Sequence, residues 1–417
     1  MEGIKMRLAR FAAFALILVF ISSTVAGADS DGRIYGKITT VDGDLFEGLI
    51  RWDKNEGSWV DFLNGNKELS ERRSSSHRKY RERRKKIKIF GILLGYTDSD
   101  SYYSNRAQSG IRVGHIETIE VVDDDVVLLT LKSGKTLELD SGSTDIGTGN
   151  REIVIEDENE GEIGFDWDDL ERVDFMQAPS GLRSIFGERL YGTVTTRRND
   201  EFTGWIAWDI DESFTSDIID GKEKHRNRKI KFGKITSIER HSSDSSVIVL
   251  KNGNEFRLRG TNDVDDSNRG IIITDMSLGE VFIDWDDFER LDLKRPPRNI
   301  KYDEFNGGTY IEGTVFTSDG EEFTGRIRWD SDEEYTWEYI DGNYHDIEMD
   351  IEFSNIAEIE KRGSRSSIVT LWDGRSFRLR GSNDVDDDNK GIFIEMENGD
   401  DSEIYWDDFE KVTFKKR

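Results

Sequence analysis

The chain has 417 residues, a formal net charge of −28 and no cysteine. The lack of thiols excludes disulfides, thiolate metal sites and a cysteine nucleophile. The acidity argues against nucleic acid as the main partner, because phosphate contact needs clustered basic residues. A chain of this length has room for roughly two to four domains with cores of their own.

Residues 1–28 are predicted to be a secretory signal peptide. Three basic residues precede the apolar run Phe11–Ile21, and Ala26–Ala28 offers a small-residue cleavage site. The run is too short for a stable membrane span, although an uncleaved anchor is the alternative. No later segment has the length of a transmembrane helix. We therefore expect export to the bacterial periplasm or the extracellular space.

Three long repeats follow the signal. Each contains an F-x-G-x-I-x-W-D stretch and closes with W-D-D. The tryptophans of these stretches are 77 residues apart in repeats two and three but 115 apart in repeat one, which therefore carries an insertion of 38 residues. The predicted boundaries are residues 33–176, 189–293 and 309–415 for the repeats and 177–188 and 294–308 for the linkers, which hold all three prolines.

Each repeat is itself a doublet. In repeat three, Ile351–Ile359 matches the closing stretch Ile404–Val412 in the spacing of its apolar residues. That spacing starts with a period of two, takes one step of three and resumes, which predicts a strand, a single helical turn and a second strand. Alternating apolar and charged residues between Asp-Gly and Asn-Gly turns predict half-buried antiparallel strands throughout.

The order of strands around a helical turn resembles the Sm-like and SH3-like group of small barrels. The matching positions are hairpin glycines and closing apolar pairs: Gly253, Gly320 and Gly374, with Ile235/Ile238 and Phe288/Leu291. The resemblance implies an all-β protein of three tandem repeats, each a pair of small barrels. The alternative is a six-bladed β-propeller. Proline occurs only between the long repeats, which favours the paired barrels.

Paired carboxylates stand in every W-D-D stretch: Asp168/Asp169, Asp286/Asp287 and Asp407/Asp408. Two carboxylates could serve a glycoside hydrolase. Neighbouring residues in a turn point apart, however, so we expect the first Asp to cap the turn and the second to face water.

Two Asn/Asp-rich loops could bind Ca²⁺, because they offer oxygen ligands at alternate positions. Asp384, Asp386 and Asp388 fit best, and Asp263 with Asp265 form the weaker copy in repeat two. The same residues also form Asx turns without metal. The corresponding loop of repeat one, 144–150, is expected to suit an ion poorly because it has a single Asp, and the W-D-x-[DN]-E loops are expected to be solvated turns.

The insertion of repeat one, residues 68–110, differs in composition from the rest of the chain. It is rich in basic residues and is the predicted site for an anionic partner, such as a lipid headgroup, a phosphoglycan, nucleic acid or another acidic protein. Its central basic residues are Arg78, Lys79, Arg81, Arg83, Arg84, Lys85 and Lys86. The alternative is a solvated arm, or one that docks on the acidic body of its own chain.

The sequence has no nucleophile elbow, P-loop or HExxH motif, and its histidines share no repeat position. We therefore expect an exported, non-enzymatic β-repeat scaffold of the cell envelope that binds a polymer or a protein partner. A Ca²⁺-dependent binding module is the first alternative, and a carbohydrate-active enzyme is the second.

Overall fold

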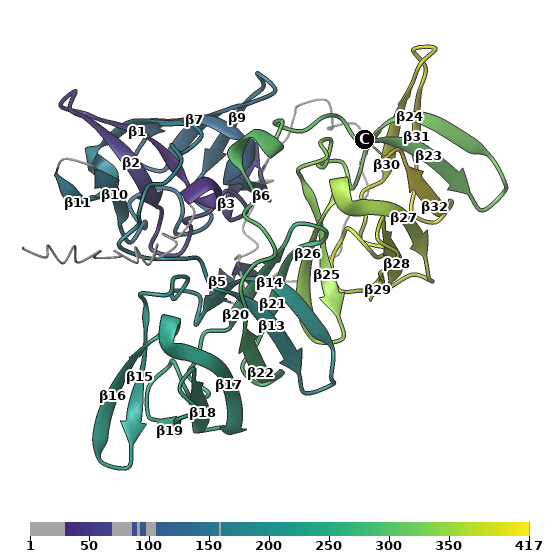
Figure 1. Ribbon diagram of the computed structural model, residues 1–417. Helices are drawn as coiled ribbons and strands as arrows, with labels where there is room; N and C mark the ends of the chain where they lie inside the picture. Colours follow the sequence, from purple (N-terminus) through teal and green to yellow (C-terminus); the bar gives the residue numbers. More distant parts are fainter. Residues whose placement is uncertain (1–29, 69–85, 90–91, 97–105, 158–159, 417) are drawn as a thin grey trace, which may run out of the picture.

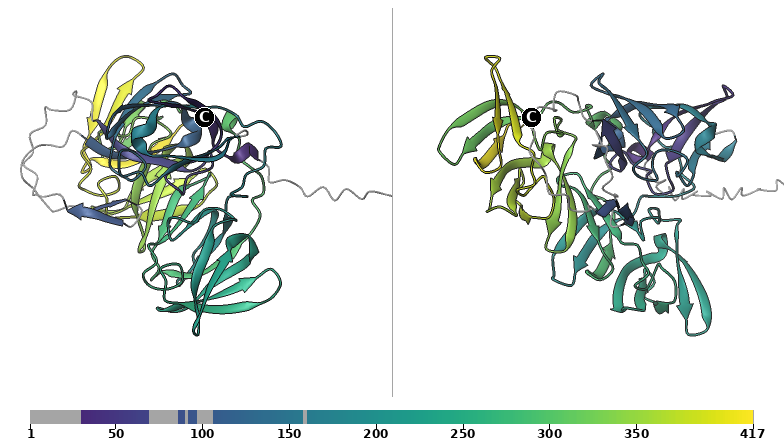
Figure 2. Two further views of the ribbon diagram at one scale, coloured as in Figure 1. Left: turned by 90° about the vertical axis from the view of Figure 1, so that its left-hand side faces the viewer. Right: turned by 180° about the vertical axis from the view of Figure 1, so that it is seen from behind.

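The computed structural model describes residues 30–68, 86–89, 92–96, 106–157 and 160–416. The predicted signal peptide and most of the basic insertion lie outside these ranges. The described chain forms three β lobes, one for each long repeat, joined side by side (Figures 1 and 2).

Repeat one supplies one ten-stranded antiparallel sheet in the order β11-β10-β2-β1-β12-β7-β8-β9-β3-β6. Its strands are β1 (Tyr35–Thr40), β2 (Leu45–Arg51), β3 (Phe62–Glu68), β6 (Arg106–Arg112), β7 (Ile116–Asp123), β8 (Val126–Leu131), β9 (Thr136–Asp140), β10 (Ile153–Asp157), β11 (Gly161–Phe165) and β12 (Leu170–Phe175). The insertion adds a separate hairpin of β4 (Lys86–Ile89) and β5 (Ile92–Tyr96).

Eight strands of repeat two and eight of repeat three keep this order, whereas the hairpin that corresponds to β3 and β6 lies outside the main sheet of its own repeat. Repeat two comprises β13 (Tyr191–Thr196), β14 (Glu201–Trp208), β15 (Ile218–Glu223), β16 (Arg226–Lys231), β17 (Ile235–Ser242), β18 (Ser245–Leu250), β19 (Glu255–Arg259), β20 (Ile271–Asp275), β21 (Gly279–Ile283) and β22 (Phe288–Leu293). Repeat three comprises β23 (Glu312–Thr317), β24 (Glu322–Arg328), β25 (Tyr339–Tyr344), β26 (Ile347–Glu352), β27 (Ile356–Lys361), β28 (Ser367–Leu371), β29 (Ser376–Leu379), β30 (Ile392–Met396), β31 (Asp401–Ile404) and β32 (Phe409–Phe414).

The two halves of a repeat are interleaved in sequence. In repeat two, β13 and β14 pair with the late strands β22 and β20, while β15 to β19 form the other half. The first two strands of repeats one and three likewise pair with late strands of their own repeat, but the hairpin of β25 and β26 joins the sheet of repeat two through β21. The doublet seen in the sequence therefore does not cut the repeat into two consecutive halves.

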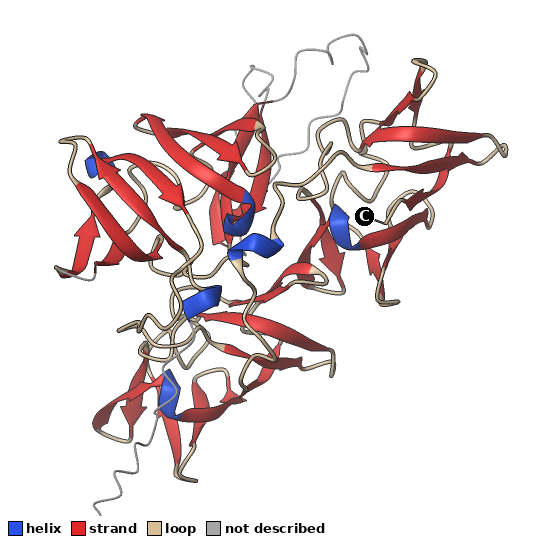
Figure 3. Cartoon of the chain, turned by 45° about the horizontal axis from the view of Figure 1, so that its top comes forward, coloured by secondary structure: helices blue, strands red, loops and turns tan. Residues whose placement is uncertain are grey.

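The expected strand, helical turn and strand are confirmed at four positions, whereas residues 285–287 and 406–408 form hydrogen-bonded turns without a 3₁₀ helix. Short 3₁₀ turns join the strands at η3 (Val113–His115), η4 (Trp167–Asp169), η5 (Phe232–Lys234) and η7 (Phe353–Asn355). Figure 3 shows these turns as short segments between strands. Two further turns, η1 (Ser30–Gly32) and η6 (Tyr302–Glu304), lie at the start of the described chain and in the second linker.

Each repeat is centred on the same buried tryptophan pair. The rings meet edge to face with centroids 6.2, 6.2 and 6.3 Å apart in repeats one, two and three. One tryptophan is the last residue of the second strand or directly follows it, and the other precedes the closing strand. The pairs are Trp52/Trp167, Trp208/Trp285 and Trp329/Trp406. These pairs join the two ends of each repeat through its core.

The all-β class is confirmed, and the strands of the described chain pair antiparallel. No sheet in the described ranges closes on itself, so the small barrels remain a prediction. The ten- and eight-stranded sheets also differ from the four-stranded blades of a propeller. Within the described part of the chain, no helix has the length and apolarity needed to cross a membrane.

Candidate functional site

The same cluster of acidic residues occurs once in each repeat, behind the W-D stretch. Each cluster joins the Asp and Glu of W-D-x-x-E to an Asp from the loop that leads into β10, β20 or β30. The members are Asp53, Glu56 and Asp145; Asp209, Glu212 and Asp263; and Asp330, Glu333 and Asp384. In the first two clusters, one carboxylate oxygen from each residue lies within 4.8 Å of the others.

The first Asp of each cluster is fully buried in a left-handed turn. Asp53, Asp209 and Asp330 are each 0% exposed, with φ of 40°, 48° and 41°. The expectation that these W-D-x-[DN]-E loops are solvated turns is therefore wrong. The adjacent tryptophan is drawn into the core and takes the Asp with it, a tertiary effect that local turn chemistry cannot show.

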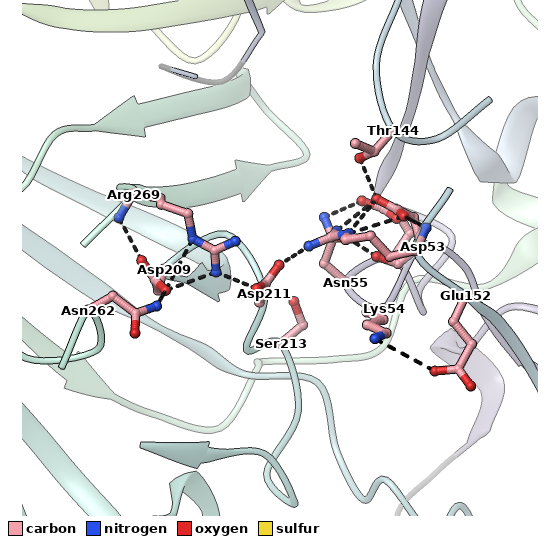
Figure 4. Close-up of polar contacts among 12 residues, drawn as sticks. Asp53, Lys54, Asn55, Thr144, Glu152, Asp209, Asp211, Ser213, Asn262 and Arg269 are labelled. Atoms are coloured by element: carbon pink, nitrogen blue, oxygen red, sulfur yellow. Dashed lines mark hydrogen bonds and ion pairs between the residues drawn. The ribbon is translucent and has the colours of Figure 1, made fainter. Parts of the chain in front are cut away.

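A basic residue compensates each buried Asp. Asp53 accepts hydrogen bonds from the backbone N–H of Arg151 at 2.6 Å and from its guanidinium at 2.7 Å. Asp209 has the same two contacts with Arg269, at 2.6 and 2.8 Å (Figure 4). In repeat three, Lys390 replaces the arginine, with its ammonium 3.5 Å from Asp330.

The loop Asp of each cluster is fixed by two contacts that recur in all three repeats. Asp145 accepts the backbone N–H of Asn64 at 2.7 Å, and its carbonyl accepts the indole N–H of Trp52 at 2.8 Å. The equivalent contacts of Asp263 are with Asp220 at 2.7 Å and Trp208 at 2.9 Å. Asp384 has the same pair of contacts, both at 2.9 Å.

The Glu of each cluster has an oxygen without a hydrogen-bond partner. The Oε2 atoms of Glu56, Glu212 and Glu333 are buried and accept no hydrogen bond from any described residue. Burial, followed by the neighbouring carboxylates, raises the pKa of Glu212 to about 9 and that of Glu56 and Glu333 well above the usual value.

The same causes act on the aspartates. Burial, with Asp53 next in effect, raises the pKa of Asp145 to about 7. Burial raises the pKa of Asp263 to about 6, against the opposing backbone hydrogen bond from Asp220. The clusters are thus groups of carboxyls in which burial disfavours full ionisation, a property shared by functional carboxyl sites and by cation-binding sites.

The structure divides the residues predicted to bind Ca²⁺. Asp263 and Asp384 belong to the clusters, whereas Asp265, Asp386 and Asp388 lie on the outer part of their loops. Asp265 accepts the backbone N–H groups of Gly260 and Ser267, and Asp386 accepts that of Asp388. Asp265 and Asp386 therefore form Asx turns.

Repeat one also supplies a loop residue to an acidic cluster. Its loop 144–150 was expected to suit an ion poorly, yet it places Asp145 in the most buried of the clusters. The missed signal was the repeat alignment itself, since Thr144-Asp145 corresponds to Asn262-Asp263 and Asn383-Asp384.

The paired carboxylates of W-D-D do not converge on a cleft. Asp168 and Asp169 are exposed, and Asp169 accepts the backbone N–H of Asp166 at 3.0 Å. The second Asp of the pair therefore makes the turn contact that was expected of the first. Asp286 is also exposed and is held by Arg240 at 3.1 Å.

The predicted anionic-partner residues Arg78, Lys79, Arg81, Arg83, Arg84 and Lys85 lie outside the described residues. Lys86 begins β4, and nothing is described of its side chain. Trp59, Trp205 and Trp337 are buried, so they pack in the core and do not form exposed stacking platforms.

No family model, characterised protein or solved structure matches the chain in comparisons with known proteins.

Proposed function

We propose that the protein is an exported, non-enzymatic scaffold of the cell envelope whose three repeats bind a polymer or a protein partner. The supporting observation is a set of ion pairs between the repeats. One carboxylate of equivalent position in each repeat closes its own turn and receives a cation from another repeat.

Asp61 represents this arrangement in repeat one. Its Oδ2 accepts the backbone N–H groups of Gly57 and Ser58, both at 2.8 Å, and its carboxylate binds Arg189 of repeat two at 2.6 Å. The equivalent Asp217 closes the turn of repeat two and binds Arg51 of repeat one at 3.0 Å.

An ion pair of the same kind joins repeat three to repeat one. Glu338 accepts two backbone N–H groups of its own turn and pairs with Lys67 of repeat one. Buried pairs of this kind cost desolvation, so they are weak evidence for extra stability, but separating the two partners leaves each charge without its counter-ion. Surfaces held at fixed separations bind an extended partner without the cost of ordering them first.

The basic insertion supports an anionic partner. It concentrates positive charge in a chain whose net charge is −28. Such a segment is attracted to anionic lipid or polymer, while the acidic body is repelled from the same surface.

Co-sedimentation with phosphatidylglycerol vesicles and with purified bacterial cell wall tests the proposal. The test variant replaces the seven basic residues from Arg78 to Lys86 with serine. A control variant removes the same charge elsewhere, at the exposed residues Lys222, Lys224, Arg226, Lys229, Lys231, Lys234 and Lys251.

We expect the wild type and the control variant to sediment with at least one of the two materials and the test variant to stay in solution. Sedimentation of none of the proteins with either material would count against the proposal. An equal loss of sedimentation in the test and control variants would show that only the overall charge of the protein matters.

A further inference from the structure

A cavity of about 150 Å³ lies between repeats one and two. Repeat one lines it with Glu56, Asp61 and Asp145, and repeat two contributes an apolar wall around Ile272 together with Glu280. The cavity therefore opens directly onto the acidic cluster of repeat one.

The arginines that line this cavity already have anionic partners. Arg189 is paired with Asp61, and Arg269 with Asp209. Arg151 contacts Asp53 and also Asp211 of repeat two. Each guanidinium thus has at least one carboxylate as its partner.

Three carboxyl groups of the cavity remain without an ion-pair partner among the described residues: Glu56, Asp145 and Glu280. Glu56 is 6% exposed and Glu280 7%. The Oε2 atom of each is buried and has no hydrogen-bond partner in the part of the chain that the structure describes. Unpartnered buried carboxyl oxygens are costly, and a cation would satisfy them.

We propose that Asp53, Glu56 and Asp145 bind a divalent cation of the Ca²⁺ type, which enters from the cavity between repeats one and two. One carboxylate oxygen from each of the three residues lies within 4.8 Å of the other two. Two oxygens on opposite sides of a Ca²⁺ ion lie about 4.8 Å apart at its usual ligand distance. This site goes beyond the scaffold function proposed above.

Arg151 is the resident counter-ion of the site. Its guanidinium holds Asp53, but it also reaches Asp211, so it keeps an anionic partner when a metal ion takes its place on Asp53. Its side chain is 26% exposed and can move towards solvent.

Ca²⁺ fits this setting better than Mg²⁺. Ca²⁺ accepts six to eight oxygen ligands in flexible geometry, whereas Mg²⁺ demands a near-ideal octahedron. Three carboxylates leave several positions for water, and the cavity has room for about five molecules at roughly 30 Å³ each.

Repeat two contains the equivalent set Asp209, Glu212 and Asp263. One carboxylate oxygen from each of these residues also lies within 4.8 Å of the other two. Glu212 is less buried than Glu56, and Arg269 bridges Asp209 and Asp211. The first repeat is therefore the better site, and the second contains a weaker counterpart at the corresponding residues.

Calorimetric titration of the calcium-free exported chain with CaCl₂, together with its Tm, tests the proposal. We expect heat of binding and a rise in Tm of roughly 2 °C or more at saturation, with a weaker response to MgCl₂. Glu56→Gln keeps the size of the side chain and should weaken binding at this site roughly tenfold or more.

Two further variants separate a metal site from a merely structural cluster. Arg151→Gln should tighten Ca²⁺ binding, because no guanidinium has to be displaced. The double variant D386N/D388N removes acidic groups from the outer part of a loop of repeat three and should bind Ca²⁺ like the wild type.

No heat and no change in Tm at millimolar CaCl₂ would overturn the proposal. Undiminished binding in Glu56→Gln, or loss of binding in D386N/D388N, would do the same. Near-ultraviolet circular dichroism checks the fold of each variant, and Asp145→Asn replaces Glu56→Gln if that variant does not fold.

Discussion

Glu280 lies in β21, 7% exposed, with one carboxyl oxygen 3.1 Å from the hydroxyl of Thr274 and the other without a described partner. Asp350 of repeat three stands opposite it across the β21–β26 ladder. Burial raises the pKa of Glu280 to about 8 against the opposing effect of Arg112. Glu280 therefore keeps its proton at neutral pH in the folded protein.

This raised pKa makes stability depend on pH. Between pH 4.5 and about 8 the unfolded chain loses the proton and the folded chain keeps it, so stability falls as pH rises through this window. We expect Glu280→Gln to raise the free energy of unfolding at pH 8 by about 1–3 kcal/mol. The gain should vanish near pH 4.5. Urea unfolding across this range measures it, and Glu289→Gln at an exposed site should change nothing.

The contribution of His115 to stability depends on pH in the opposite direction, since it is lost as pH falls. It accepts the backbone N–H of Gly307 at 3.1 Å and packs edge to face on Phe305. Burial, with Arg112 and Lys132 adding repulsion, lowers the pKa of His115 to about 3. The folded protein therefore holds His115 neutral where the unfolded chain would protonate it.

Acid should thus destabilise the fold through His115. The unfolded chain gains a proton below about pH 6.5 and the folded chain does not, which costs at most about 1.4 kcal/mol per pH unit until about pH 3. His115→Asn keeps an acceptor without this titration. Unfolding at about pH 7 and about pH 5 should show a smaller loss in His115→Asn than in wild type. The exposed His225→Asn should behave like wild type, and an unchanged loss in His115→Asn would contradict the assignment.

At the scale of elements, the pairing of β21 with β26 adds one hairpin of repeat three to the sheet of repeat two. Gly279 opens β21 opposite Ile351, with φ of 147°, and a Cβ there would lie 1.9 Å from the carbonyl oxygen of Asp350. Gly161 opens the equivalent β11 of repeat one, with φ of 83°, and a Cβ there would meet nothing within 4 Å. The two glycines therefore differ in whether another repeat approaches them.

This pair of positions offers a matched test. Gly161→Ala should cost only the strain of a left-handed residue, about 1–2 kcal/mol. Gly279→Ala should cost more, roughly 3–5 kcal/mol, because the backbone of β26 must move away. Chemical denaturation compares the two variants. Hydrogen exchange should show faster exchange in β26 for Gly279→Ala alone, and equal losses would refute the close approach.

Across the whole molecule, Arg112 ties the three repeats together. It is 1% exposed, pairs with Glu352 of repeat three at 2.7 Å, and donates to the carbonyls of Val60 and Asp275 in repeats one and two. A single hydrophobic cluster also spans repeats two and three, while that of repeat one includes Trp205 and Trp337. The repeats therefore share their cores and their buried charges.

We expect the protein to unfold in one cooperative calorimetric transition despite its three repeats. Arg112→Met leaves Glu352 buried without its cation, which should cost about 3–5 kcal/mol and separate the transitions. The double variant with Glu352→Gln should recover part of the loss, because no unpaired charge remains. An unchanged single transition in Arg112→Met would show that other contacts hold the repeats together.

The strand-rich class, the three repeats and several of the short helical turns could be predicted from the sequence, because they follow from local periodicity and from a pattern repeated along the chain. Which carboxylates meet depends on the tertiary structure. Asp53 and Asp145 are 92 residues apart in the chain, and only the fold of Trp52 into the core brings them together. The role of Arg112 in three repeats at once has the same origin, since sequence patterns report the period of an element but not the partner that covers its face.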